Sequence, residues 1–122
     1  MNALCHVLIS ALTAATCMQA ATVAAQSWPV KPVRVIVPVS AGGGIDTVAR
    51  AMAQKYSESW SQPVVVENRA GAGGTIGADV VAKAPRDGYT LLVNSTSQAT
   101  SAVQYAKLPY DAIKDFAPAS QI

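Results

Sequence analysis

The sequence predicts an α/β fold built on a parallel sheet, and three observations lead to this prediction. Short, apolar, β-branched runs at residues 33–37, 63–67 and 89–93 have the composition of strands. Between them, residues 45–60 and 75–84 carry apolar residues at helical spacing, and each helix follows a glycine-rich loop. Continuous apolar strands that alternate with helices are typical of a parallel sheet covered on both faces, which is a three-layer lobe.

The first helix is predicted from apolar residues that recur every three or four positions: Ile45, Val48, Ala49, Met52, Tyr56 and Trp60. In the second helix Ile76 and Val80 are expected to face inward, and Pro85 ends the segment. A turn at residues 86–88 leads to the third strand. A less regular helix is expected over residues 99–105, and residues 116–122 have the character of the start of another strand.

Residues 1–25 have the features of a secretory signal peptide. They contain no Lys, Arg, Asp or Glu, and their apolar core, residues 7–15, is too short to span a bilayer. Small residues precede the junction, so cleavage is predicted after Ala25 and export to the periplasm follows. Two alternatives to a cleaved signal peptide are a buried helix of the mature fold and a lipoprotein anchor on Cys17. The β-branched Thr16 disfavours the anchor, and the polar, proline-containing junction that follows disfavours the helix.

Both cysteines and the only histidine lie in this segment, at Cys5, Cys17 and His6. Residues 26–122 therefore contain no disulfide, no Cys/His metal site and no His-based catalytic triad. We expect no catalytic residue, no metal and no cofactor, and hence a binding protein and not an enzyme. The nine Lys and Arg and seven Asp and Glu are dispersed, which gives no basic stripe for nucleic acid.

The two glycine loops are the candidate binding site. Loops after the carboxyl ends of parallel strands converge on one crevice. The first N–H groups of a helix lack intrahelical partners and attract anions, and glycine lets a ligand approach the backbone closely. A small carboxylate needs only a few such donors. The candidate residues are Ser40, Ala41, Gly42, Gly43, Gly44, Asp46, Ala72, Gly73, Gly74, Thr75 and Ser95.

Each candidate also has a purely structural interpretation. The glycines suit tight turns, Asp46 and Thr75 suit helix N-caps, and Ser95 suits a solvated loop. Arg69, at the start of the second loop, is expected to form a surface ion pair with Glu67 or Asp87. A side chain at Gly43 or Gly73 is expected to weaken ligand binding more than it weakens the fold, because it would block close approach to the backbone.

Nucleotide-binding motifs are incomplete. Neither loop carries the lysine of a phosphate-binding P-loop. The second loop has Gly71 and Gly73, but Ile76 stands where a dinucleotide-binding motif has its third glycine. The third strand ends at Asn94 with no carboxylate for a ribose. A nucleotide-dependent α/β enzyme and a ligand-sensing signalling domain remain the alternative functions.

An ordered set of short motifs runs through the segment after residue 27. The motifs are Trp-Pro-x-Lys-Pro-Val-Arg at 28–34, Ala-Gly-Gly-Gly-x-Asp at 41–46, Val-Glu-Asn-Arg-x-Gly-Ala-Gly-Gly-x-Ile-Gly at 66–77, Ala-Pro-x-Asp-Gly-Tyr-Thr-Leu-Leu at 84–92 and Lys-Leu-Pro-Tyr-Asp at 107–111. In this order they resemble the Bug family of periplasmic solute receptors, the substrate-binding component of tripartite tricarboxylate transporters.

The resemblance implies a two-domain, Venus-flytrap receptor of the type II-like periplasmic binding protein class. It implies a ligand such as a tricarboxylate, dicarboxylate, acidic amino acid or aromatic acid, held by backbone amides of residues 39–46 and 69–76. It further implies a monomer that delivers the ligand to a membrane permease. Residues 26–122 then form the N-terminal part of the first domain, and the second domain is missing. Ser40 stands where a small apolar residue is commoner in the family, and residues 94–100 match no strong pattern of it. The identity of the ligand therefore stays open.

Overall fold

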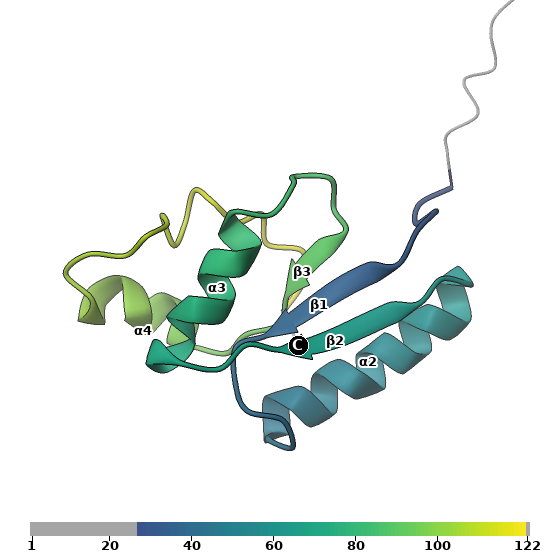
Figure 1. The fold of residues 1–122 in the computed structure, drawn as a ribbon, viewed down its shortest axis with the longest axis horizontal. Helices are drawn as coiled ribbons and strands as arrows, with labels where there is room; N and C mark the ends of the chain where they lie inside the picture. The colour runs from purple at the N-terminus through teal and green to yellow at the C-terminus, as the bar shows by residue number, and fades with distance from the viewer. Residues whose placement is uncertain (1–26, 122) are drawn as a thin grey trace, which may run out of the picture.

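The computed structural model describes residues 27–121, so the predicted signal peptide and its cleavage point lie outside the described residues. The elements follow one another in the predicted order of strand, helix, strand, helix, strand and helix (Figure 1). They are β1 (Val33–Val37), α2 (Gly44–Trp60), β2 (Val64–Asn68), the 3-10 turn η1 (Ala72–Gly74), α3 (Thr75–Ala82), β3 (Thr90–Leu92) and α4 (Ser97–Gln104).

The three strands form one parallel sheet in the order β2-β1-β3. The central strand β1 pairs along its whole length with β2, from Val33 opposite Val64 to Val37 opposite Asn68. On its other side Ile36 lies opposite Leu92 of β3. Val33, Ile36 and Val37 are completely buried, as expected for a β-branched strand between two neighbours and two helical layers. The predicted parallel sheet is confirmed.

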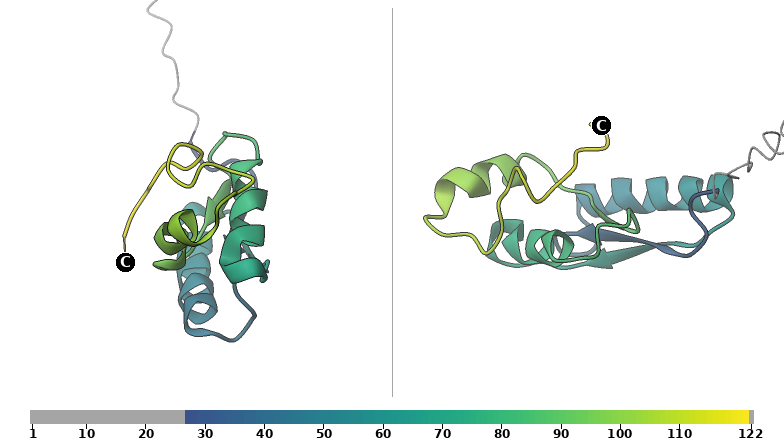
Figure 2. Two further views of the ribbon diagram at one scale, coloured as in Figure 1. Left: turned by 90° about the vertical axis from the view of Figure 1, so that its left-hand side faces the viewer. Right: turned by 90° about the horizontal axis from the view of Figure 1, so that it is seen from above.

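Helices cover the two faces of this sheet, which confirms the three layers (Figure 2). Val35 and Val37 pack with Ala49 of α2 on one face. Because successive residues of a strand point to opposite faces, the next residue, Pro38, is directed to the other face, where it contacts Gly74 and the first turns of α3. α2 packs mainly on β2 and β1, whereas α3 packs on β3 and β1.

The buried face of α2 agrees only in part with the predicted one, since Ala49 is buried and Ile45 packs against the core as expected. In α2 the buried residues are Asp46, Ala49 and Ala53, whereas Tyr56 remains 38% exposed. The small side chains of the two alanines let the helix lie close to the strands, and the larger apolar residues flank this contact. Tyr56 instead stacks on Trp60 with 4.5 Å between ring centroids, and Trp28 meets Trp60 edge-on at 4.9 Å.

Two further predictions about the elements are wrong. Ile76, expected to point inward from α3, is half exposed. Its side chain lies over Gly71, because the glycines around it take the positions closest to the sheet. Residues 116–121 form no strand, and no strand of the described residues pairs with them, while residue 122 lies outside the described residues. The helix expected over 99–105 is present as α4, two residues earlier at its start.

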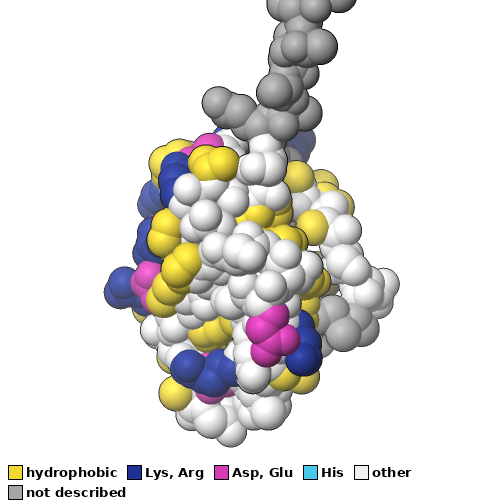
Figure 3. All heavy atoms as spheres, turned by 90° about the vertical axis from the view of Figure 1, so that its right-hand side faces the viewer, with side chains coloured by type: hydrophobic (Ala, Val, Ile, Leu, Met, Phe, Trp, Pro, Cys, Tyr) yellow, Lys and Arg dark blue, Asp and Glu magenta, His cyan; other side chains and the backbone are white. Residues whose placement is uncertain are grey.

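The described surface carries charges of both signs in pairs. Figure 3 shows Lys and Arg side chains next to Asp and Glu on one face of the molecule. Examples are Lys31 with Asp87 at 2.9 Å and Arg34 with Glu67 at 2.8 Å. Within residues 27–121 no helix has the length and apolar character needed to cross a membrane, and no cluster of three metal-binding side chains occurs.

Candidate functional site

Three loops leave the sheet at the carboxyl ends of its strands. Because the strands are parallel and in register, residues 38–43, 69–71 and 93–96 begin at the same edge (Figure 1). The loop after β1 leads to α2 on one face of the sheet. The loop after β3 leads to α4, which contacts η1 and α3 on the other face. Neighbouring strands whose connections diverge to opposite faces form a switch point, where open α/β sheets bind ligands.

A crevice of about 390 Å³ lies at this switch point. Gly44, Ile45 and Val48 of α2 form one wall, and Val93 and Asn94 at the end of β3 form the other. Gly44 and Ile45 are the first two residues of α2, so their N–H groups have no partner within the helix. The crevice therefore combines apolar walls with the partially positive end of a helix.

The first loop presents its backbone to solvent. Ser40, Ala41, Gly42, Gly43 and Gly44 are all exposed. Gly43 caps the helix with an extended backbone (φ −76°, ψ 168°) and no side-chain hydrogen bond. In residues 27–121, no acceptor pairs with the N–H groups of Gly43 and Gly44, whereas the N–H of Gly42 donates to Asp46 Oδ2 at 2.8 Å. Of the predicted donors of this loop, Gly43 and Gly44 therefore keep N–H groups without an acceptor in the described residues, and Gly42 does not.

Asp46 supports this loop from beneath. Its side chain is 3% exposed and lies at the third residue of α2, so the predicted N-cap role is wrong: Gly43 takes that position. Besides the Gly42 amide, Asp46 Oδ2 accepts a hydrogen bond from Arg50 Nε at 3.0 Å, and Oδ1 accepts one from Asn68 Nδ2 at 2.8 Å. The carboxylate thus joins the first loop, α2 and the end of β2.

Asn68 and Arg50 complete the network. Asn68 Nδ2 also donates to the carbonyl of Val39 at 3.1 Å, and Arg50 Nη2 donates to Asn68 Oδ1 at 2.9 Å. The hydrogen bonds from Arg50, then from Gly42 and Asn68, hold the pKa of Asp46 at about 2, against the opposing effect of burial. Asp46 is therefore ionised at neutral pH, and its oxygens are engaged by the protein.

This network predicts an acid-dependent stability. Because the pKa of Asp46 is lowered from 3.8 to about 2 on folding, its contribution is fully present above pH 4 and is lost as the pH falls toward 2. We expect Asp46→Asn to lower the melting temperature at pH 5 to 7 and to approach the wild type near pH 2. Melting curves recorded between these values test this, with the exposed Glu58→Gln on the same helix as control. Parallel curves for wild type and Asp46→Asn would contradict it.

The second loop has a left-handed backbone. Four consecutive residues, Gly71 to Gly74, have φ values of +133°, +46°, +64° and +95°. Only glycine adopts such angles without strain, and Ala72 is the single exception here. Thr75 does not cap α3. Its hydroxyl and its N–H both donate to the carbonyl of Ala72, while the cap position belongs to Gly74.

Some backbone N–H groups of the second loop thus donate hydrogen bonds to carbonyls of the same loop. The N–H of Gly74 donates to the carbonyl of Gly71 at 2.9 Å, and Gly74 is buried against Pro38. Within residues 27–121 the N–H groups of Ala72 and Gly73 have no acceptor. Of the residues predicted in this loop, these two keep donors for a ligand, and the other two hold the loop in shape.

The third loop is organised by a residue that was not predicted. Asn94 Oδ1 accepts hydrogen bonds from the N–H of Ser95 at 2.8 Å and from the hydroxyl of Ser97 at 2.7 Å. Ser95 itself is exposed and its hydroxyl lies 3.4 Å from that of Ser97. Arg69 pairs with Glu67 at 3.3 Å, as expected, which leaves the backbone as the main source of positive potential.

The structure brings some predicted residues together and separates others. Gly44 is the predicted residue that lines the crevice, whereas the second loop and Ser95 are not among its lining residues. The second loop meets Pro38 on the other face of the sheet. Asn68 and Asn94 were missed, although the sequence contains a signal for both of them. The second and third strand patterns are each followed within a residue by an asparagine, where a polar side chain can position the loop that follows.

Comparisons with known proteins identify the family of the chain. Residues 48–122 match the sequence profile of the tripartite tricarboxylate transporter family receptor, TctC. The chain belongs to this family. It is 44% identical over 110 residues to protein BugT of Bordetella pertussis, covering 88% of this chain and 34% of BugT. The resemblance to the Bug receptors is thus confirmed.

Two solved structures are similar to the chain. MatC from Rhodopseudomonas palustris, with bound malate, is 41% identical with a TM-score of 0.69, over 75% of this chain and 31% of MatC. An R. palustris protein with adipate is 40% identical with a TM-score of 0.67, over 70% of this chain and 29% of that protein. The chain spans about a third of the length of these relatives.

Proposed function

We propose that this receptor chain binds a small carboxylate at the carboxyl edge of its sheet. The backbone N–H groups of residues 43–45, and those of Ala72 and Gly73, donate hydrogen bonds to the ligand. Ser40, Ala41 and Ser95 border the site, and Asp46, Gly74 and Thr75 hold its loops. In this proposal the protein is exported after cleavage near Ala25 and acts in the periplasm as a monomer. It delivers the ligand to a membrane permease and catalyses no reaction.

One observation carries this proposal. The exposed amides of Gly43 and Gly44 lie at the start of a 17-residue helix beside the crevice at the switch point. In residues 27–121 they have no acceptor of their own, and the nearest acid, Asp46, is already bound by three donors. A carboxylate would satisfy these amides and the helix dipole without a cationic side chain. Malate and adipate, found with the two solved relatives, are ligands of this chemistry.

A thermal-shift screen tests the proposal. The full chain is heated with a panel of carboxylates that includes malate, adipate and citrate, and with sugars and nucleotides as controls. A carboxylate at about 100 times its dissociation constant should add about 2.7 kcal/mol, or about 10 °C for a domain of this size. Stabilisation by sugars or nucleotides, with none by any carboxylate, would disprove the carboxylate receptor.

A chimera makes a negative result informative. In the chimera, residues 27–121 replace the corresponding segment of the malate-bound relative. The rest of that relative then completes the receptor. We expect the chimera to bind malate if the loops of this chain supply their part of the site. A chimera that folds but does not bind any carboxylate would count against the proposed donors.

A further inference from the structure

Tyr105 lies against the second loop, far from it in sequence. It follows α4, which contacts η1. A Cβ built on Gly73 would lie 3.1 Å from the Tyr105 hydroxyl. The φ of Gly73, +64°, favours glycine, and the phenol of Tyr105 occupies the space beside it.

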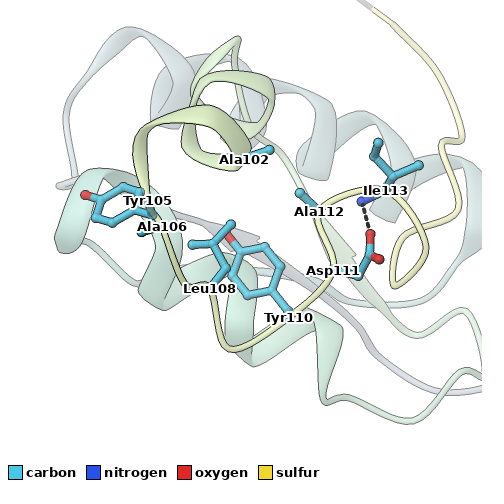
Figure 4. A pocket seen from close by; sticks show the side chains of 8 residues that line it. All are labelled: Ala102, Tyr105, Ala106, Leu108, Tyr110, Asp111, Ala112 and Ile113. Atoms are coloured by element: carbon cyan, nitrogen blue, oxygen red, sulfur yellow. Dashed lines mark hydrogen bonds between the residues drawn. The ribbon is translucent and has the colours of Figure 1, made fainter.

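The hydroxyl points out of the groove that its ring helps to form. This groove, of about 280 Å³, runs between α4 and the segment after it, and Leu108 and Tyr110 also line it. Figure 4 shows the Tyr105 hydroxyl directed away from both of these side chains. Tyr105 is 39% exposed, and its hydroxyl has no hydrogen-bond acceptor in residues 27–121.

Two backbone donors belong to the loop beside this hydroxyl. The N–H groups of Ala72 and Gly73 lie in the same loop, again with no acceptor in the described residues. A phenol can donate one hydrogen bond, and an anion next to several donors satisfies them together.

We propose that Tyr105, which lies beside the second loop, is a ligand-binding residue whose hydroxyl donates a hydrogen bond to an oxygen of the bound carboxylate. This inference rests on the proposed function, since it assigns one more donor to the same ligand. Tyr105 thereby adds a side-chain donor, from the segment after α4, to a site otherwise built from backbone amides.

Tyr110 supplies a matched control. It lines the same groove and is 8% exposed, and its buried hydroxyl has no partner in the described residues. Its ring packs against Phe116 at 5.6 Å, away from the second loop. Tyr110→Phe therefore removes a phenol hydroxyl from the same part of the chain without touching the proposed site.

The test measures malate and adipate binding by calorimetry and melting temperature without ligand, for the wild type, Tyr105→Phe and Tyr110→Phe, in the full chain and in the chimera. We expect Tyr105→Phe to bind the preferred acid about 10-fold more weakly, with an unchanged melting temperature, because a hydrogen bond to a charged acceptor is lost while the ring stays. Tyr110→Phe should bind as the wild type does.

Three outcomes would overturn the inference. Wild-type affinity in Tyr105→Phe would show that the hydroxyl does not contact the ligand, while the proposed function stands. A melting temperature that falls together with affinity in Tyr105→Phe would assign Tyr105 to loop support. Absence of carboxylate binding in the wild-type chain and in the chimera would remove the proposed function, and this inference with it.

Discussion

Gly77→Val is expected to destabilise the fold by about 3 kcal/mol, which is much of the net stability of a small domain. Gly77 lies in the buried face of α3, and a Cβ there would stand 2.8 Å from Pro38 Cβ and 3.0 Å from the carbonyl oxygen of Arg69. Neither neighbour can move cheaply, because one is a proline ring on the backbone and the other is the backbone itself. The substitution would push α3 off the sheet.

Urea unfolding of Gly77→Val and Gly77→Ala measures this effect. Replacing glycine by alanine inside a helix normally stabilises a protein by about 1 kcal/mol. We expect Gly77→Ala to lower the stability instead, and this opposite change would be due to the steric contact of the added Cβ. Gly44→Ala is the matched control, because nothing lies within 4 Å of its Cβ position and it begins α2. A rise in stability for Gly77→Ala would refute the close approach of α3 to Pro38.

Gly43→Val is expected to weaken carboxylate binding about 10- to 100-fold while leaving the fold nearly intact. Its φ of −76° suits any residue, and its Cβ position is an ordinary 3.7 Å from the nearest atom, the Ser40 carbonyl oxygen. The fold should lose at most about 1 kcal/mol through the poorer cap. The branched side chain would cover the free amides of Gly43 and Gly44, and hydrogen bonds to a charged ligand are among the stronger ones.

Gly73→Val provides the contrast. The two glycines were expected to behave alike, but Gly73 has φ +64° and faces the Tyr105 hydroxyl at 3.1 Å from its Cβ position. We therefore expect Gly73→Val to lose stability as well as affinity. Calorimetry with the preferred acid and thermal melts without ligand separate the two effects. Wild-type affinity in Gly43→Val would exclude the first loop from the binding site.

The candidate site could be predicted only in outline. The glycines and the helix starts are visible as local patterns, and they placed both loops correctly at the carboxyl edge of the sheet. Asp46 was recognised but misassigned, because its true role depends on Asn68, 22 residues away, and on the conformation of Gly42. Tyr105 was missed since nothing in its own neighbourhood indicates that it reaches Gly73.

The errors in the fold also arise where the outcome depends on contacts between residues that a local sequence pattern does not show. Periodicity correctly gave the existence and order of the elements, but it gave only part of the buried face of α2. In α2 the buried face is set by the small residues Ala49 and Ala53, while Tyr56 gains more by stacking on Trp60. A strand at residues 116–121 would require a pairing partner, and β-branched or apolar composition alone does not supply one.

By itself the sequence determined the parallel α/β architecture, the two glycine loops and the family, because these follow from hydrophobic runs, turn residues and ordered motifs close together in the chain. The tertiary structure alone decided which backbone amides remain free, how closely α3 approaches Pro38 and where the hydroxyl of Tyr105 lies. These features are distances between residues remote in sequence, and such distances are fixed only when the helices pack on the sheet.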